Sequence, residues 1–242
     1  MLAVALGRRG SAQTLGRTER RMKQLLNAVG EDRWFLVTSV SSERRNLVLR
    51  FESLPAPSDG SIGAWLISCR HVREFSLTDF DGGGLNFWTK NHPLLSQFSS
   101  QKASLRVTVG GRTTAECVGV LLKIHRQSVD DWIDFDRFVP PAISTRTDAR
   151  PIAIDGPEFL LTHYRRGLEA AGFGATLKKH RRALYWSGFG WSERRHRVSL
   201  LHFGNSFIVG ESFSAEPEAT EHVLPNKRLQ PSALGAIVRR RG

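Results

Sequence analysis

Alternating apolar and polar residues, interrupted by glycine turns, fill the stretch 64–139 and constrain the fold more than any other feature. Residues 104–109 alternate with the period of a β-strand that has one face in water. Gly110 and Gly111 follow at once, and two glycines suit a tight type I′ turn. Residues 118–124 alternate again. The pattern therefore predicts an antiparallel hairpin whose second strand runs through residues 118–124.

Other segments extend this pattern on both sides. The β-rich runs 34–40 and 47–51 predict a first hairpin. Residues 157–171 place their leucines on one helical face, with Asp155 in position to cap the first turn and Gly172 at the end. We therefore expect an α+β fold, mostly antiparallel β-sheet, with one main helix (about residues 157–171) packed on a face. Further strands are expected over 65–77, as one long strand or a bent pair, and over 85–87, 185–191, 196–203 and 207–213.

The two ends of the chain differ in composition from the rest. Residues 1–21 contain five arginines and one glutamate, and residues 225–242 contain five cationic side chains and no acidic one. We expect residues 1–21 and 217–242 to be disordered basic ends around a single domain over residues 22–216. We also expect Met22 to be the true start, with residues 1–21 translated from upstream of it.

The formal net charge of +12 is distributed unevenly along the sequence. The two ends account for +4 and +5, which leaves +3 on residues 22–224. Cations on flexible ends attract polyanions only weakly and in a salt-sensitive way. The sequence therefore favours a protein partner over nucleic acid, and it leaves the oligomeric state open. No run reaches the roughly 20 apolar residues that cross a bilayer, so no membrane association is expected.

One basic cluster within the body is dense enough to consider as a binding surface. It combines four cations with two tryptophans, Lys178, Lys179, Arg181, Arg182, Trp186 and Trp191. Cations beside aromatic rings can hold the phosphates of a single strand and stack on its bases. A solvated loop beside a strand edge explains the same residues and is the favoured interpretation.

Two groups of residues could support catalysis. Cys69 and His71 share one face of a predicted strand, so a thiol and an imidazole could act as nucleophile and base. The alternative is that Cys69 is a small packing residue, which is the usual role of a strand cysteine. Two cysteines and no export signal favour reduced thiols in the cytoplasm.

Acidic residues gather around Trp132, and carboxylate oxygens of this kind bind Mg²⁺ or Ca²⁺. They are Asp130, Asp131, Asp134 and Asp136. Bulky apolar residues are interleaved with them, so docking of this segment on the core is favoured over metal binding. Neither a phosphate-binding glycine loop nor a zinc-ligand spacing occurs. No cofactor is therefore expected.

Three features carry a resemblance to known sequences. The segment 92–95, the predicted hairpin and the segment 132–138 together resemble an uncharacterised bacterial protein family. The stretch 224–242 resembles a tail, encoded by a repetitive DNA element, that ends many unrelated bacterial proteins. The family has no known activity, so this resemblance implies a bacterial protein but no site. The tail resemblance implies that this end has no function.

These observations leave three hypotheses for function. The first is a non-catalytic bacterial binding module. The second is a hydrolase-type enzyme that uses Cys69 and His71, or the aspartates of segment 130–136. The third is single-stranded nucleic-acid binding through residues 178–197. The absence of recognisable catalytic geometry favours the first hypothesis.

Overall fold

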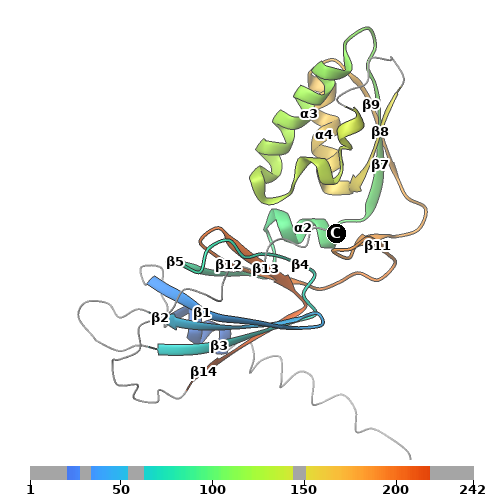
Figure 1. The fold of residues 1–242 in the computed structure, drawn as a ribbon. Coiled ribbons are helices and arrows are strands. Elements are labelled where there is room, and N and C mark those ends of the chain that lie inside the picture. The colour runs from blue at the N-terminus through green and yellow to red at the C-terminus, as the bar shows by residue number, and fades with distance from the viewer. Residues whose placement is uncertain (1–20, 28–33, 54–62, 144–150, 219–242) are drawn as a thin grey trace, which may run out of the picture. The chain divides into compact units, whose positions relative to one another are not determined.

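The computed structural model describes residues 21–27, 34–53, 63–143 and 151–218 (Figure 1). These residues form two compact units, which we describe separately. Unit 1 contains the described residues up to Phe87 and those from Ser199 onward, and unit 2 runs from Trp88 to Val198. The predicted α+β class with antiparallel sheets is confirmed. The expected single domain over residues 22–216 instead divides into these two units.

Unit 1 consists of two sheets. One has the strand order β14-β3-β2-β1-β5 and the other the order β4-β13-β12-β6. Residues 21–27 add a helical segment. The strands are β1 (Trp34–Glu43), β2 (Asn46–Ser53), β3 (Gly63–Arg70), β4 (Glu74–Ser76), β5 (Asp81–Gly83), β6 (Leu85–Trp88), β12 (Ser199–Phe203), β13 (Ser206–Gly210) and β14 (Ser212–Pro217).

The predicted first hairpin is confirmed as β1 paired antiparallel with β2. The last predicted pair is also present as β12 and β13, joined at Gly204, whose φ of 52° a glycine adopts without strain. Strands β12 to β14 complete sheets that β1 to β6 begin, so the sequence of unit 2 is inserted within unit 1. The alternating pattern of strands placed no boundary at Trp88 or Val198, which is why a single domain was expected.

Three aromatic rings join the two sheets of unit 1. The ring centroids of Phe35, Phe51 and Phe203 lie 5.3–5.9 Å apart in tilted or edge-to-face arrangements, which aromatic quadrupoles favour. Phe35 and Phe51 belong to the five-stranded sheet and Phe203 to the other. Met22 and Leu25, from the helical segment 21–27, enter the same core. Burial of these side chains stabilises unit 1.

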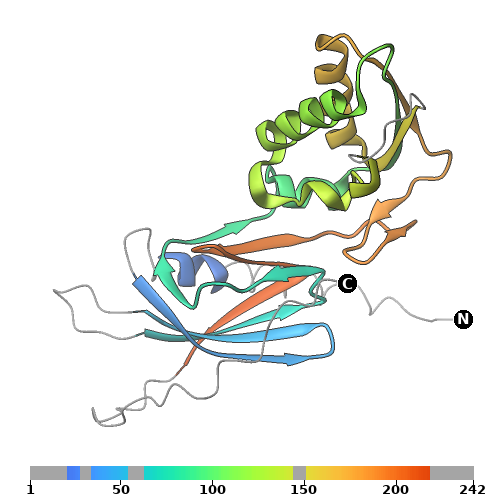
Figure 2. The same cartoon turned by 45° about the horizontal axis from the view of Figure 1, so that its top comes forward.

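Unit 2 contains a three-stranded antiparallel sheet of order β8-β7-β9. Helix α4 packs on one face of this sheet, α3 packs against α4 on the same side, and no described helix covers the other face (Figures 1 and 2). A short hairpin of two further strands follows β9. The elements are α2 (Pro93–Ser99), β7 (Lys102–Thr108), α3 (Thr114–Val129), η1 (Asp130–Trp132), η2 (Phe135–Arg137), η3 (Pro141–Ile143), β8 (Ile152–Pro157), α4 (Glu158–Ala170), β9 (Gly174–Lys179), β10 (Tyr185–Trp186) and β11 (Trp191–Ser192).

Only the first strand and the turn of the predicted central hairpin are confirmed, and the second strand is wrong. Strand β7 is present, and Gly110 and Gly111 both have positive φ as a turn requires. The chain then forms helix α3 where a returning strand was predicted over residues 118–124. Thr113 and Glu116 form a capping box that starts this helix. The alternation in 118–124 therefore had no cross-strand partner, and β7 pairs with β8 and β9 instead.

The main helix is confirmed as α4, and Gly172 follows it with a φ of 81°. The predicted cap is wrong, because Asp155 lies within β8 and its carboxylate accepts a hydrogen bond from Ser104. The hydroxyl of Ser100 instead accepts a hydrogen bond from the amide of Phe159, at 3.0 Å. The cap comes from a residue far away in the sequence, so local spacing could not identify it.

The predicted basic ends fall largely outside the described residues, at 1–20 and 219–242. At the described margins, Arg21 is helical and forms an ion pair with Glu216, whose Oε1 lies 2.6 Å from its Nη1. Glu218 accepts a hydrogen bond from Arg50 at 2.5 Å. Ordered contacts therefore begin one residue earlier and extend two residues further than the expected domain over residues 22–216.

Candidate functional site

Unit 2 carries a large positive charge, although residues 22–224 as a whole are close to neutral. The sequence of unit 2 contains eighteen Lys and Arg and ten Asp and Glu residues, a net charge of +8. The remaining parts of the body, residues 22–87 and 199–224, contain seven Lys and Arg and twelve Asp and Glu residues, a net charge of −5. The positive charge of unit 2 creates a potential that attracts polyanions.

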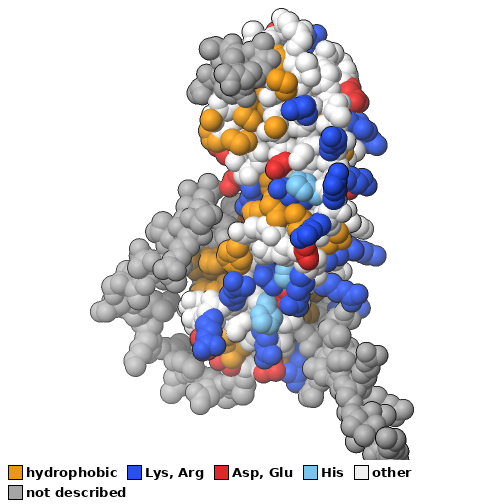
Figure 3. Space-filling view, turned by 90° about the vertical axis from the view of Figure 1, so that its right-hand side faces the viewer, with side chains coloured by type: hydrophobic (Ala, Val, Ile, Leu, Met, Phe, Trp, Pro, Cys, Tyr) orange, Lys and Arg blue, Asp and Glu red, His pale blue; other side chains and the backbone are white. Residues whose placement is uncertain are grey.

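Most of the positive charge of unit 2 lies in the segment 178–197. This segment contains seven Lys and Arg residues and one acidic residue, Glu193. All seven cationic side chains are exposed, and lysine and arginine side chains gather on this side of unit 2, in the upper half of Figure 3. The seven are Lys178, Lys179, Arg181, Arg182, Arg194, Arg195 and Arg197. We call this surface the basic band.

The basic band is fixed to the sheet by backbone hydrogen bonds. The amide of His180 donates to the carbonyl of Lys102 at 3.3 Å, and the amide of Lys102 donates to the carbonyl of Leu184 at 2.7 Å. Trp186 pairs with Trp191 across the β10–β11 hairpin. These contacts hold the part of the basic band from Lys178 to Arg182 against β7, and they fix the hairpin that precedes Arg194, Arg195 and Arg197.

The open face of the three-stranded sheet continues the basic band. Side chains of β7 alternate between a buried set and a set that faces away from the helices. Ser104 is directly opposite Lys178 on one side and Asp155 on the other, so these three side chains share the open face. Arg106 is two residues after Ser104 on β7, so it lies on the same face, and its side chain is exposed. The open face is therefore polar and presents further cations.

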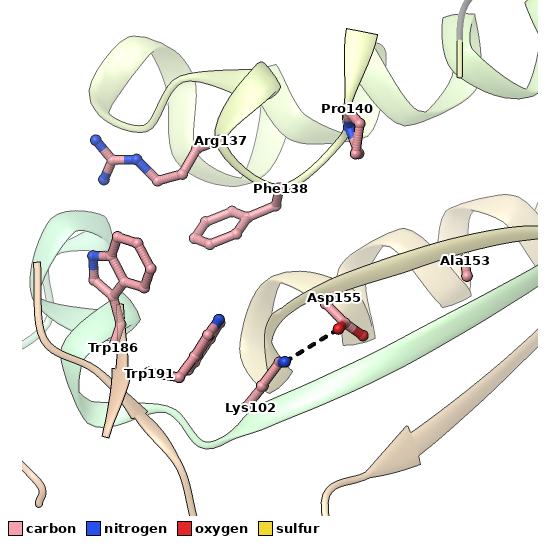
Figure 4. Close-up of a pocket in the computed structure, with 8 residues that line it drawn as sticks. All are labelled: Lys102, Arg137, Phe138, Pro140, Ala153, Asp155, Trp186 and Trp191. Atoms are coloured by element: carbon pink, nitrogen blue, oxygen red, sulfur yellow. Dashed lines mark ion pairs between the residues drawn. The ribbon is translucent and has the colours of Figure 1, made fainter. Parts of the chain in front are cut away.

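Where the open face meets the hairpin, unit 2 contains a pocket of about 430 Å³ (Figure 4). Its walls combine aromatic rings with cationic side chains. The ring centroids of Trp186 and Trp191 lie 5.6 Å apart, and those of Trp186 and Phe138 lie 6.0 Å apart. The lining residues are Lys102, Arg137, Phe138, Pro140, Ala153, Asp155, Trp186 and Trp191.

The two charged groups on the sheet side of the pocket neutralise each other in part. The ammonium of Lys102 lies 3.1 Å from the carboxylate of Asp155 and 5.5 Å from the ring centroid of Trp191. Burial alone raises the pKa of Asp155, but the hydrogen bond from Ser104 and the ammonium of Lys102 outweigh it and lower that pKa. Asp155 is therefore an ionised group with its oxygens already engaged.

The segment that brings Arg137 and Phe138 to the pocket is anchored by a buried histidine. The Nε2 of His125 lies 2.5 Å from the carbonyl oxygen of Ile133, and its Nδ1 lies 2.7 Å from the hydroxyl of Tyr164. Since a carbonyl only accepts, Nε2 carries the proton and Nδ1 accepts from Tyr164. This bridge ties α3, α4 and the segment after α3 together.

The His125 bridge predicts that unit 2 loses stability in weak acid. Burial lowers the pKa of His125 below 6.5, although the carbonyl of Ile133 and the carboxylates of Asp134 and Asp131 oppose this shift. The unfolded chain then binds a proton more readily than the folded one, so stability falls as the pH drops below 6.5 toward the folded pKa. Hydrogen exchange of the α3 and α4 amides should therefore quicken between about pH 7.5 and 5.5, after correction for intrinsic rates.

His202 provides the comparison in unit 1. Burial lowers its pKa in the same direction, so the readout must come from the α3 and α4 amides and not from the whole chain. Corrected exchange in these two helices that stays constant, or slows, as the pH falls would contradict the role given to His125.

The structure does not bring Cys69 and His71 together on one face. Cys69 is fully buried among core residues, and this burial raises the pKa of its thiol. Strand β3 ends at Arg70, and His71 is an exposed residue with a φ of 51°. The two residues do not share a strand face, because the chain turns between them. A buried protonated thiol is a packing group, so this geometry does not support a Cys69 nucleophile.

The aspartates around Trp132 are exposed, while the apolar residues between them pack inward. Ile133 and Phe138 are buried, as the docking interpretation requires. Within the described part of the chain, no group of three or more His, Cys, Asp or Glu residues is placed to hold a metal ion. The four predicted candidates Asp130, Asp131, Asp134 and Asp136 therefore lie on η1, η2 and the turns beside them without forming a ligand set.

Sequence reasoning named Trp186 and Trp191 but missed the other walls of the pocket. Lys102 lies outside the predicted strand 104–109, and Asp155 was expected to be a helix cap. Arg137 and Phe138 belong to the segment considered for docking. Their convergence depends on the strand order β8-β7-β9 and on helix α3, neither of which the residue pattern predicted.

The chain matches no family model, no curated protein and no solved structure. No helix among the described residues combines the length and the apolar character needed to cross a bilayer.

Proposed function

We propose that this protein is a binding module whose unit 2 holds single-stranded nucleic acid along the basic band. The observation that carries this proposal is the arrangement of seven exposed cations beside the β10–β11 hairpin, with a single acidic residue among them. The earlier preference for a protein partner depended on a nearly neutral body. The net charge of +8 on unit 2 removes that premise.

Aromatic side chains favour a single strand over a duplex. Trp186 and Trp191 lie in the hairpin within the basic band, and Phe189 at the tip of the hairpin is 67% exposed. Exposed rings stack on unpaired bases, whereas the bases of a duplex are already stacked on each other. Cations of the band and of the open sheet face would contact the phosphates. This combination is typical of proteins that bind single strands with little sequence preference.

The proposal is tested on the full chain with the charge of its two ends removed. Glutamine replaces every Lys and Arg of the ends except Arg21, which pairs with Glu216. Affinity for a labelled oligonucleotide of about 12 nucleotides, within the usual site size, is then measured between about 50 and 200 mM salt. The substituted residues are Arg8, Arg9, Arg17, Arg20, Lys227, Arg228, Arg239, Arg240 and Arg241.

We expect this variant to keep most of its affinity and a steep salt dependence, because the basic band is intact. Binding that disappears with the charge of the ends would assign it to residues 1–20 and 219–242 and refute the proposal. A complementary duplex should bind less tightly than the single strand. Equal affinity for the single strand and the duplex would mean that charge alone causes binding and that the aromatic rings have no part in it.

A further inference from the structure

The pocket beside the hairpin has a composition that selects its ligand. One side consists of three aromatic rings, from Phe138, Trp186 and Trp191. The other contains the ammonium of Lys102, and Arg137 lies at the rim (Figure 4). The volume of about 430 Å³ is in the range of pockets that hold small ligands. A ligand that fits this lining has a flat ring and a negative group.

A cationic ligand is disfavoured even though aromatic rings often bind cations. The face of Trp191 already has the ammonium of Lys102 over it, at 5.5 Å from the ring centroid. The one lining carboxylate, Asp155, already accepts from Ser104 and pairs with Lys102. A second cation would meet Lys102, Arg137 and the positive potential of unit 2 without a counter-charge to receive it.

A guanidinium at the rim favours an anionic group there. The guanidinium of Arg137 donates to Gln97 at 3.0 Å and lines the pocket, and a guanidinium is a common partner of phosphate. The indole Nε1 of Trp186 is buried, and no described residue accepts a hydrogen bond from it. In Figure 4 this nitrogen is on the side of the ring away from Trp191. This nitrogen therefore does not face the cavity, and the anionic group of a ligand is placed by Arg137 alone.

We propose that the pocket takes one nucleotide of the bound strand, with the base among Phe138, Trp186 and Trp191 and the phosphate at Arg137. This inference rests on the proposed function, because the hairpin that forms the pocket wall lies within the basic band. It adds a site for an unstacked base to a surface that otherwise contacts the backbone of the strand. The band provides affinity along the strand, and the pocket selects a base over a bare sugar phosphate.

The test compares three ligands on the full chain at low salt: uridine monophosphate, ribose 5-phosphate and the single-stranded oligonucleotide. Equilibrium dialysis should show that the nucleotide binds more tightly than ribose 5-phosphate, because only the nucleotide carries a base. Trp191→Ala should weaken nucleotide binding about tenfold or more, and Trp191→Phe should restore part of it. Arg137→Gln keeps an amide near Gln97, and it should weaken the binding of both uridine monophosphate and ribose 5-phosphate.

The matched control removes two cations of the band outside the pocket lining, Arg181→Gln with Arg182→Gln. This variant should have a lower affinity for the oligonucleotide and an unchanged affinity for uridine monophosphate. If the nucleotide and ribose 5-phosphate bind equally, or if Trp191→Ala and Arg137→Gln change neither, the pocket assignment is overturned while oligonucleotide binding still stands. If the nucleotide binds and the oligonucleotide does not, the pocket is a site for a free nucleotide, and the proposed function and the place of the pocket along a strand are both overturned.

Discussion

Replacing Arg181, Arg182, Arg194 and Arg195 by glutamine should lower the affinity for a single-stranded oligonucleotide roughly a hundredfold near 0.1 M salt. The logarithm of the affinity falls linearly with the logarithm of the salt concentration, and each phosphate contact with a single strand contributes about 0.7 to this slope. Loss of four contacts should therefore flatten the slope by about 3. Fluorescence anisotropy titrations at several salt concentrations measure both quantities.

The control removes the same amount of charge from other parts of unit 2. Lys90, Lys123, Arg126 and Arg166 are exposed, and the last three lie on helices α3 and α4, which lie on the opposite side of the sheet. Replacing these four by glutamine should change the slope by much less. Equal losses in the two variants would show that only the net charge of unit 2 matters, and the basic band would no longer be a defined surface.

Tyr164→Ala should destabilise unit 2 by about 3–5 kcal/mol, the usual cost of deleting a buried aromatic side chain. Tyr164 is fully buried, and it also donates to His125. Tyr164→Phe keeps the ring and removes only this hydrogen bond, so it should cost about 1–3 kcal/mol. Urea unfolding followed through hydrogen exchange of α3 and α4 separates unit 2 from unit 1.

His163→Ala is the matched control, since His163 is the adjacent residue on α4 and its side chain is exposed. This change should stay within about 0.5 kcal/mol of the wild type. A Tyr164→Ala variant as stable as His163→Ala would mean that the packing of α3 against α4 does not depend on Tyr164. A Tyr164→Phe variant as stable as the wild type would remove the His125 bridge as a stabilising contact.

The candidate site was only partly predictable from the sequence. The cations of segment 178–182 and the two tryptophans stand close together in the sequence, so composition alone identified them. The cations were then discounted because net charge was summed over residues 22–224. That sum combined a unit of +8 with parts that total −5. Separating the two required the boundary at Trp88 and Val198, which only contacts in three dimensions define.

The sequence by itself determined the elements whose signals are local. The hairpin of β1 and β2 and the helix α4 follow from the period of their apolar residues and from the residues that end them. The segment after Gly111 was different, because it fits a strand through residues 118–124 and also a helix that buries Cys117, Leu121 and His125. Intrinsic preferences differ by less than about 1 kcal/mol per residue, so they do not decide between the two.

Tertiary structure selects the helix, because packing against α4 and the bridge from His125 to Tyr164 stabilise it. It also formed the pocket, whose walls come from β7, η2, β8 and the β10–β11 hairpin. Residues such as Lys102 and Trp191 are far apart in the sequence, and their meeting depends on which strands pair. Strand pairing is set by burial of whole faces, a collective property that no short stretch of the chain contains.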